Sequence, residues 1–264
     1  MPSYDDLPIL DYGERGTVTV AANAEGVANL AVQTFSTALT TAWTNRGSAA
    51  IALSGGSTPK RMGELLAHSD FPVPEAWEHV DIFWGDERWV PLDNPESNAG
   101  VALETFLTKV PIPLERIHPF YEEGLDEAQA AALYQALIEE IVPAENGIPA
   151  FDLIFLGMGD DGHTASLFPY SPALTIRDRL VVPNFVEKLN TTRLTFTTTL
   201  LNAAREVVFL VTGSGKAERL KEVLEGPIET ERLPSQLIRP TNGTLRWLVD
   251  QGAASALSGG PFRE

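Results

Sequence analysis

Short runs of almost continuous apolar residues constrain the fold of this chain more than any other feature. The clearest are Ala49–Leu53 (AAIAL), Val80–Trp84 (VDIFW), Phe151–Leu156 (FDLIFL) and Glu206–Val211 (EVVFLV). Strands that are apolar on both sides belong to a sheet that is covered on both faces, and segments with helical spacing separate these runs. We therefore predict an α/β fold with a mostly parallel central sheet, built as a single domain over residues 1–264.

The remaining elements follow from the same periodicities. Further strands or extended segments are predicted at Thr17–Ala22, Leu180–Val186, Arg193–Phe196 and Leu245–Val249. Helices are predicted at Ala24–Trp43, Lys60–Ala67, Ala99–Thr108 and Asp126–Ile141, and from the end of Thr212–Lys216 to about Leu224. The segment Gly85–Ser97 is expected to be a long polar loop.

Polar, glycine-rich loops come directly after several of the apolar strands. They lie at 54–58, 85–98, 157–166 and 212–216. In an open α/β sheet, ligands bind outside the carboxyl ends of the strands. We therefore expect these loops to meet at one edge of the sheet and to form a site there.

The charge balance limits the partners of the protein. The formal net charge is −17, which argues against nucleic acid or anionic lipid as a partner, because both need a basic surface. An anionic substrate would need a local positive island. The chain has no cysteine, no signal-like apolar region at its start and no apolar stretch near the ~18 residues of a membrane span. The expected location is the cytoplasm.

The first loop, SGGSTP at 54–59, is compatible with phosphate binding. Gly55 and Gly56 would let backbone N–H groups approach a ligand closely, and Thr58 could cap the following helix, whose free N–H groups attract anions. An ordinary strand-to-helix turn explains the same residues. A third reading makes Ser54 a nucleophile, because ALSGG nearly matches a nucleophile elbow, but the residues before the helix do not fit that turn.

Two cations could reach the same edge. Arg88 follows a strand and could grip a phosphate, or it could form an internal ion pair with Asp86 and Glu87. Lys216 stands at a predicted helix start and could supply a point charge or remain a surface lysine. The local sequence does not decide between the alternatives for Arg88, and for Lys216 alone it favours the surface lysine.

His163 is the histidine with the strongest case for chemistry. It lies in a glycine-rich turn after a buried strand, with Asp160 and Asp161 beside it, and a carboxylate can orient an imidazole as a general base. The match of Gly157–Gly162 to G-x-G-x-x-G is weak, because Pro169 follows too soon for a helix that packs on the sheet. A single histidine in a loop is also compatible with a purely structural role.

Taken in order, motifs at four places resemble one protein family. They are LSGGSTP at 53–59, GDERWVP with SN at 85–98, LGMGDDGHTASLFP at 156–169 and GSGKA at 213–217. Together they resemble the glucosamine-6-phosphate isomerase/6-phosphogluconolactonase family, most closely its lactonases. The similarity runs from the first predicted helix to the last predicted strand.

The resemblance implies a Rossmann-like three-layer α/β/α sandwich. It also implies hydrolysis of 6-phospho-D-glucono-1,5-lactone to 6-phospho-D-gluconate in the oxidative pentose phosphate pathway, without a metal or an organic cofactor. The partner would be a small phosphosugar lactone, and a monomer and a dimer both remain open.

The resemblance also assigns roles to individual residues by their positions. His163 matches the catalytic base, Asp161 its companion carboxylate, and Asp86 a second carboxylate of the site. The residues that match the phosphate-binding end are Gly55, Gly56, Ser57, Thr58, Arg88, Lys216 and Asn98.

The deaminases of the same family share several of these motifs. Their histidine loop carries an acidic residue immediately before its proline, where this chain has Phe168 before Pro169. A phenyl ring cannot transfer a proton, so the sequence favours the lactonase. A deaminase that acts on glucosamine 6-phosphate and a phosphosugar-binding module without turnover remain as alternatives.

Overall fold

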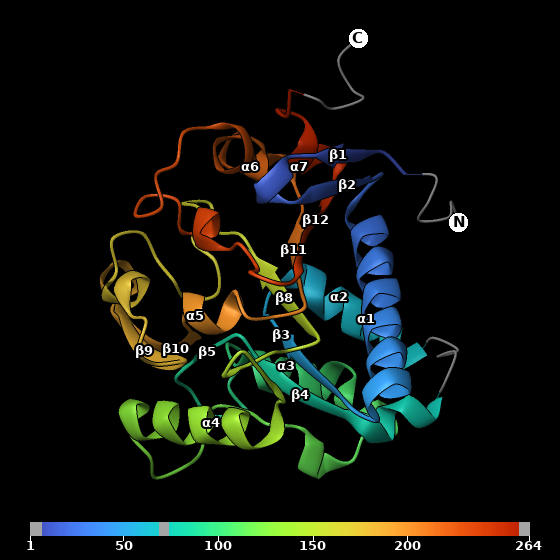
Figure 1. Ribbon diagram of the computed structural model, residues 1–264, viewed down its shortest axis with the longest axis vertical. Helices are drawn as coiled ribbons and strands as arrows, with labels where there is room; N and C mark the ends of the chain where they lie inside the picture. Colours follow the sequence, from blue (N-terminus) through green and yellow to red (C-terminus); the bar gives the residue numbers. More distant parts are fainter. Residues whose placement is uncertain (1–6, 69–73, 259–264) are drawn as a thin grey trace.

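The computed structural model describes residues 7–68 and 74–258, which are organised around a seven-stranded sheet. The strand order across the sheet is β1-β2-β12-β11-β8-β3-β4 (Figure 1). All neighbouring strands are parallel except β1 and β2. The strands are β1 Ile9–Asp11, β2 Thr17–Ala21, β12 Thr244–Asp250, β11 Glu206–Val211, β8 Leu153–Gly157, β3 Ala49–Leu53 and β4 Val80–Trp84.

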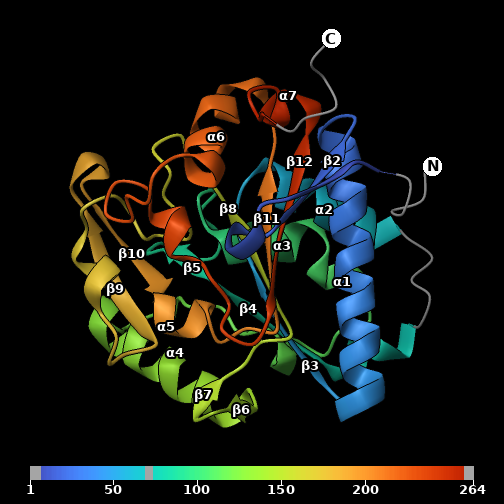
Figure 2. The same cartoon turned by 45° about the horizontal axis from the view of Figure 1, so that its top comes forward.

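Helices cover one face of this sheet. The long helix α1 (Ala24–Arg46) lies along that face, α2 (Ser57–His68) packs beside it, and α3 (Asn98–Thr105) packs against α2 (Figure 2). The side chain of Asn23 begins α1 by accepting a hydrogen bond from the N–H of Gly26 at 2.9 Å, as a good N-cap residue does. The remaining helices are α4 Glu127–Ile141, α5 Thr198–Leu201, α6 Ala217–Glu225 and α7 Gln251–Ala254.

A second, antiparallel sheet covers part of the other face. It contains β5 (Asp86–Arg88), β10 (Thr191–Phe196) and β9 (Val181–Val186), in that order, and α4 packs against β9 and β10. The small sheet and α5 lie on the side of the central sheet away from α1 (Figures 1 and 2). A short hairpin, β6 Ala144–Glu145 with β7 Ile148–Pro149, completes the strands.

The strand β5 corrects one expectation from the sequence. The segment Gly85–Ser97 was expected to be loop throughout, but residues 86–88 pair with β10, with Asp86 opposite Thr195. Three charged residues in a row carry no strand signal. The segment pairs because β10 lies beside it, and the N–H of Phe196 at the end of β10 also donates to the carbonyl of Gly85 at 2.8 Å.

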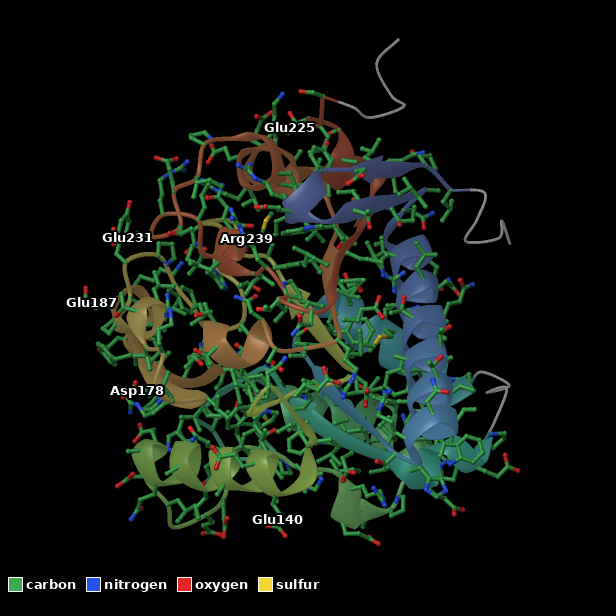
Figure 3. The ribbon with its side chains drawn as sticks, in the orientation of Figure 1. Glu140, Asp178, Glu187, Glu225, Glu231 and Arg239 are labelled. Carbon is green, nitrogen blue, oxygen red and sulfur yellow. The ribbon has the colours of Figure 1, made fainter. Side chains whose placement is uncertain are left out.

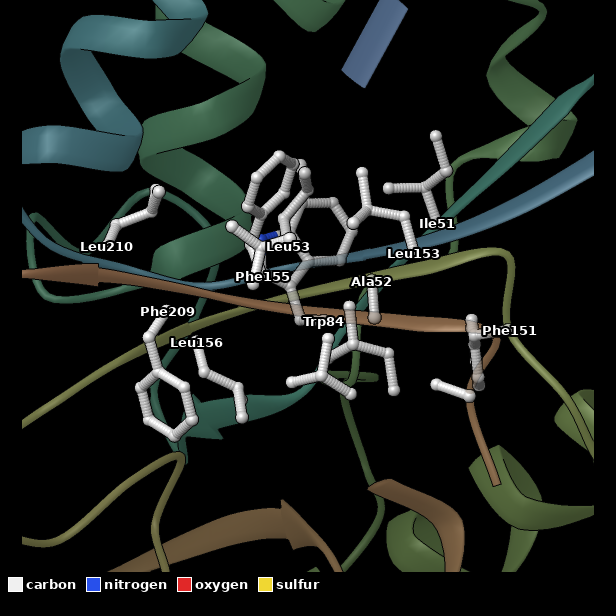
Figure 4. Close-up of a cluster of buried hydrophobic side chains, with 14 of the residues drawn as sticks. Ile51, Ala52, Leu53, Trp84, Phe151, Leu153, Phe155, Leu156, Phe209 and Leu210 are labelled. Carbon is white, nitrogen blue, oxygen red and sulfur yellow. The ribbon is translucent and has the colours of Figure 1, made fainter. Parts of the chain in front are cut away.

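The core confirms that the central strands are buried on both sides. Neighbouring residues of one strand, such as Phe155 with Leu156 and Phe209 with Leu210, point to opposite faces of the sheet (Figure 4). All of these side chains are buried. The prediction of an α/β fold with a mostly parallel sheet is therefore confirmed, whereas the extent of the single domain stays a prediction.

The order of the strands fixes where a crevice can form. The chain leaves β3 towards β4 on one side, and it leaves β8 towards β11 on the other. Loops diverge at such a switch point, and the crevice between them is where doubly wound proteins bind ligands. The loops concerned are 54–56 after β3 and 158–163 after β8.

The surface carries much of the acidic charge. Glu140, Asp178, Glu187 and Glu231 are exposed and project at the rim of the molecule (Figure 3). Among the described helices, none is long and apolar enough to cross a membrane.

Candidate active site

A cleft of about 320 Å³ opens at the carboxyl ends of the central strands, at the switch point. Its walls come from each of the polar loops that the sequence placed at this edge. The lining residues from those loops include Gly55, Gly56, Asp86, Arg88, Asn98, His163 and Lys216. The topology therefore brings together segments that are more than 150 residues apart in the chain.

The histidine turn leaves β8 and closes on itself. The N–H of Gly159 donates to the carbonyl of His163 at 2.8 Å, and Gly162 adopts a φ of +83°, which favours glycine. A Cβ on Gly159 would lie 2.0 Å from His163 Nδ1. The turn thus needs glycine at position 159 to let the imidazole fold back onto it.

The imidazole of His163 is fixed by a hydrogen bond at one ring nitrogen and by stacking on an aromatic ring. Its Nδ1 lies 2.5 Å from Asp161 Oδ1, and its ring stacks on Phe168 with a centroid distance of 4.1 Å. In the neutral imidazole, the Nδ1 contact to a carboxylate assigns the proton to Nδ1 and leaves the Nε2 lone pair free. No group in residues 7–68 and 74–258 bonds Nε2, and His163 lines the cleft.

The two neighbouring aspartates behave differently. Burial disfavours ionisation of Asp161, but hydrogen bonds from His163 and from Lys188 outweigh it and hold the pKa of Asp161 below its usual range. Asp160 points outward and pairs with Lys216, which lowers the pKa of Asp160. Asp161, and not Asp160, is therefore the carboxylate that contacts the imidazole.

The loop after β3 approaches its surroundings closely. A Cβ on Gly55 would lie 1.8 Å from the Asn98 side chain, and Gly56 has a φ of +111°. The helix α2 begins at Ser57, and the Gly56 carbonyl accepts the first bond from the N–H of Lys60 at 3.1 Å. The backbone at 55–57 is therefore at a helix N-terminus that faces the cleft, where an anion is favoured.

Two residues of this loop differ from expectation. Thr58 is not the N-cap of α2, because it lies inside the helix, and its hydroxyl bonds the hydroxyl of Thr212 at 3.1 Å. Ser57 does not line the cleft that holds His163. It lines an adjoining recess of about 300 Å³, which shares Gly55 and Arg88 with the cleft.

An ion pair within Asp86, Glu87 and Arg88 was one of two alternatives, and it does not form in the described part of the chain. The buried carboxylate of Glu87 accepts hydrogen bonds from the backbone N–H groups of Arg88, Asn98 and Ala99, each at 2.8 Å. Two of these N–H groups belong to the first residues of α3, where a negative charge is favoured. Arg88 instead donates from Nη1 to the carbonyl of Glu96 at 2.6 Å. The rest of its guanidinium is left for the cleft.

Asp86 and Asn98 both line the cleft and are hydrogen-bonded to their surroundings. The Asp86 carboxylate is buried and accepts the hydroxyl of Ser166 at 2.6 Å. The Asn98 side chain donates to the backbone carbonyl of Asp86 at 3.0 Å. Asp86 thus lines the cleft but is not hydrogen-bonded to His163.

Sequence reasoning missed Arg193, which reaches the cleft from β10. Burial, followed by repulsion from Arg88, lowers the pKa of Arg193. Within the described residues, the buried Nε atoms of Arg88 and Arg193 have no hydrogen-bond partner, nor has the hydroxyl of Ser54, which lines the same cleft. Unsatisfied buried donors around one space are costly unless a ligand binds them. No sequence signal marks Arg193, because it stands in a polar strand far from the glycine loops.

The unpartnered hydroxyl also bears on the nucleophile reading. A serine nucleophile needs a base within hydrogen-bond reach, and Ser54 Oγ has no such partner. Across the described residues, no group of three or more His, Asp or Glu side chains is placed to hold a metal ion.

The fold and the cleft define an α/β protein of the doubly wound class with a candidate small-molecule site at its switch point. The model of the family described as glucosamine-6-phosphate isomerases/6-phosphogluconolactonase matches residues 22–247. The chain belongs to this family.

Individual relatives agree with that placement. A 6-phosphogluconolactonase of Synechocystis sp. is 44% identical over 241 residues, which is 91% of this chain and 98% of the relative. The solved 6-phosphogluconolactonase of Trypanosoma brucei is 26% identical, with a TM-score of 0.81 over 91% of this chain and 98% of that one. A monomeric glucosamine-6-phosphate deaminase has a TM-score of 0.73 over 90% of this chain and 99% of its own, but at 18% identity it shows the common fold alone.

Proposed function

We propose that the protein hydrolyses 6-phospho-D-glucono-1,5-lactone to 6-phospho-D-gluconate. The observation that carries the proposal is the imidazole of His163, held by Asp161 and Phe168 with Nε2 open to a cleft that also holds unpaired cationic donors. The curated relatives, which carry the name 6-phosphogluconolactonase, support the same substrate.

The phosphate would dock at the cationic end of the cleft. The backbone N–H groups at the start of α2 and the guanidinium groups of Arg88 and Arg193 would bind its oxygens. Lys216 lines the same space, and its present partner Asp160 is exposed, so the phosphate can compete for the ammonium. This end would fix the substrate and leave its lactone carbonyl near His163.

The chemistry would then need one base that becomes an acid. Neutral His163 accepts a proton at Nε2 from a water molecule, and the water oxygen bonds to the lactone carbon C1. The tetrahedral intermediate collapses as the bond from C1 to the ring oxygen breaks, and the imidazolium returns its proton to that oxygen. Asp161 stabilises the imidazolium while it exists and keeps the ring oriented.

Two backbone N–H groups of the histidine turn are not available to bind the developing oxyanion. The N–H groups of Gly159 and Gly162 bond carbonyls within the turn itself. They therefore do not serve as free donors for the oxyanion.

A coupled assay tests the proposal directly. Freshly made lactone is supplied, and 6-phosphogluconate is followed with its NADP-dependent dehydrogenase at several protein concentrations, after subtraction of spontaneous hydrolysis. A rate proportional to protein and absent from His163→Ala is expected. A rate equal to the spontaneous one would refute the proposal.

The same preparation separates the alternatives. Release of ammonia from glucosamine 6-phosphate would identify a deaminase, and thermal stabilisation by 6-phosphogluconate without lactone hydrolysis would identify a binding module. We also propose a cytoplasmic location on the basis of the composition, which cell fractionation would test.

A further inference from the structure

Lys188 supports the histidine site from outside the cleft. It lies in the 3-10 turn Glu187–Leu189, which joins β9 to β10. Its Nζ forms an ion pair with Asp161 Oδ2, while Asp161 Oδ1 contacts His163 Nδ1 at 2.5 Å. One carboxylate is thus shared between an ammonium group and the imidazole.

A second contact ties Lys188 to the same histidine. Its Nζ lies 4.7 Å from the centroid of the Phe168 ring, and that ring stacks on His163. A cation over an aromatic face is attracted by the ring quadrupole. Both partners of Lys188 therefore contact His163 directly, unlike the partners of an ordinary solvent-exposed lysine.

Lys188 does not line the cleft where the substrate is proposed to bind. It lines a separate recess of about 600 Å³, together with Asp161 and Phe168. Lys216, by contrast, lines the cleft itself. Lys216 is therefore placed to bind phosphate, whereas Lys188 is placed to act on the site only through Asp161 and Phe168.

The physical consequence concerns the charge on His163. A carboxylate at hydrogen-bond distance favours the imidazolium form, which cannot accept a proton from water. We propose that Lys188 is a positioning residue that offsets the charge of Asp161 and so limits how strongly this carboxylate favours the imidazolium form of His163. The inference rests on the proposed hydrolysis, in which neutral His163 is the base.

Other charges around His163 form a constant background. They come from its own turn, from β5, from β10, from the segment that leads into α6 and from α6 itself. They are Asp160, Asp86, Arg88, Arg193, Lys216 and Arg219, the last of which donates to the Asp160 carbonyl. Glu187 is the exposed neighbour of Lys188 on the hairpin. Replacement of Lys188 alone leaves this background in place.

The first test is the pH dependence of kcat/KM for Lys188→Met. Loss of the ammonium should move the acidic limb to higher pH by roughly half a unit to one unit, because the lysine is half exposed and its effect is screened. The rate would fall about 3- to 10-fold at a pH below the limb and stay unchanged on the neutral plateau. Lys188→Arg should restore the wild-type profile.

A matched control is Lys221→Met on α6. Its ammonium pairs with Glu225 at 3.9 Å, and it lines neither the cleft nor the recess beside Asp161. Its pH profile should coincide with that of the wild type. An unmoved acidic limb in Lys188→Met, or an equal loss of rate at every pH, would overturn the inference.

A second readout does not require turnover. The chain has four histidines, so the ring signal of His163 can be assigned by its absence from His163→Gln and titrated by NMR. Its midpoint should move to higher pH in Lys188→Met and not in Lys221→Met. An unmoved midpoint refutes the role of Lys188 even in an active enzyme, whereas a moved midpoint in a protein that hydrolyses no lactone refutes only the proposed function.

Discussion

The two ends of the cleft are built in different ways. At the cationic end, the donors come from separate elements: the start of α2, β5, β10 and the segment before α6. At the other end, the segment that follows β8 supplies His163, Asp161 and Phe168. Asp161 is hydrogen-bonded to the imidazole of His163, and the ring of Phe168 stacks on it. Binding at the first end is shared among several groups, whereas the chemistry at the second depends on one imidazole. Single substitutions at the cationic end should therefore weaken substrate binding only in part. Loss of His163 at the other end should abolish most of the catalysis.

The largest effect is expected for His163→Ala. A positioned base contributes ~10²–10⁴-fold to the rate, so turnover should fall by about that factor while KM changes little. Steady-state kinetics with the lactone measures both constants. Turnover at the wild-type level would eliminate His163 as the base and with it the contrast between the two ends.

Gly159→Ala tests whether the turn itself holds the imidazole. The added Cβ would meet His163 Nδ1 at 2.0 Å and Asp161 Oδ1 at 2.9 Å. A displacement near 1 Å can cost roughly 10²-fold in rate, so a loss of turnover of that order is expected. Gly215→Ala is the matched control, because its Cβ would meet nothing within 4 Å. Equal activity of the two variants would show that the turn tolerates the displacement.

Arg88→Ala tests the other end of the cleft. One charge-assisted hydrogen bond contributes about 1.5–3 kcal/mol, so KM should rise roughly 10- to 100-fold with turnover largely kept. Arg61→Ala, which removes an exposed guanidinium paired with Glu25 and Glu64, should leave both constants unchanged. A fall in turnover without a rise in KM would indicate that Arg88 contacts the lactone carbonyl rather than the phosphate.

The smallest effect concerns the framework under the cationic end. Burial raises the pKa of Glu87, although hydrogen bonds from the N–H groups of Ala99, Asn98 and Arg88 act in the opposite direction. Because the folded pKa lies above the unfolded one, this contribution to stability is present below the unfolded pKa and is lost as the pH rises through the folded pKa. Relative to Glu87→Gln, the wild type should therefore gain unfolding free energy in urea between about pH 7 and pH 4.5. A difference in unfolding free energy between the two proteins that does not change with pH would contradict the raised pKa of Glu87.

The sequence predicts the central sheet well because its signals are local. The ranges of β3, β4 and β11 agree with their apolar runs at both ends, since a strand that is buried on both sides needs apolar residues along its whole length. The strand β5 has no such signal, because its pairing depends on where β10 lies in the fold. Local patterns thus predict elements whose burial is complete and miss elements that form through a partner.

The same distinction applies to the candidate site. Glycine loops after strands indicate Gly55 and His163, because backbone approach needs glycine and the edge of the sheet is fixed by topology. Arg193 and Lys188 belong to β10 and to the turn before it, and only the folded position of the small sheet brings them to His163 or the cleft. The cap at Thr58 was wrong because α2 begins at Ser57, two residues before the start that a cap at Thr58 requires.

The place of β12 in the sheet affects how the chain can fold during synthesis. This strand, Thr244–Asp250, lies between β2 and β11 and pairs in parallel with both. Until the ribosome has released it, β2 has no parallel neighbour and the sheet is split into two parts. Long-range parallel pairing of this kind is slow and leaves strand edges exposed meanwhile. Removal of the last strand should therefore prevent closure of the sheet rather than only trim its end.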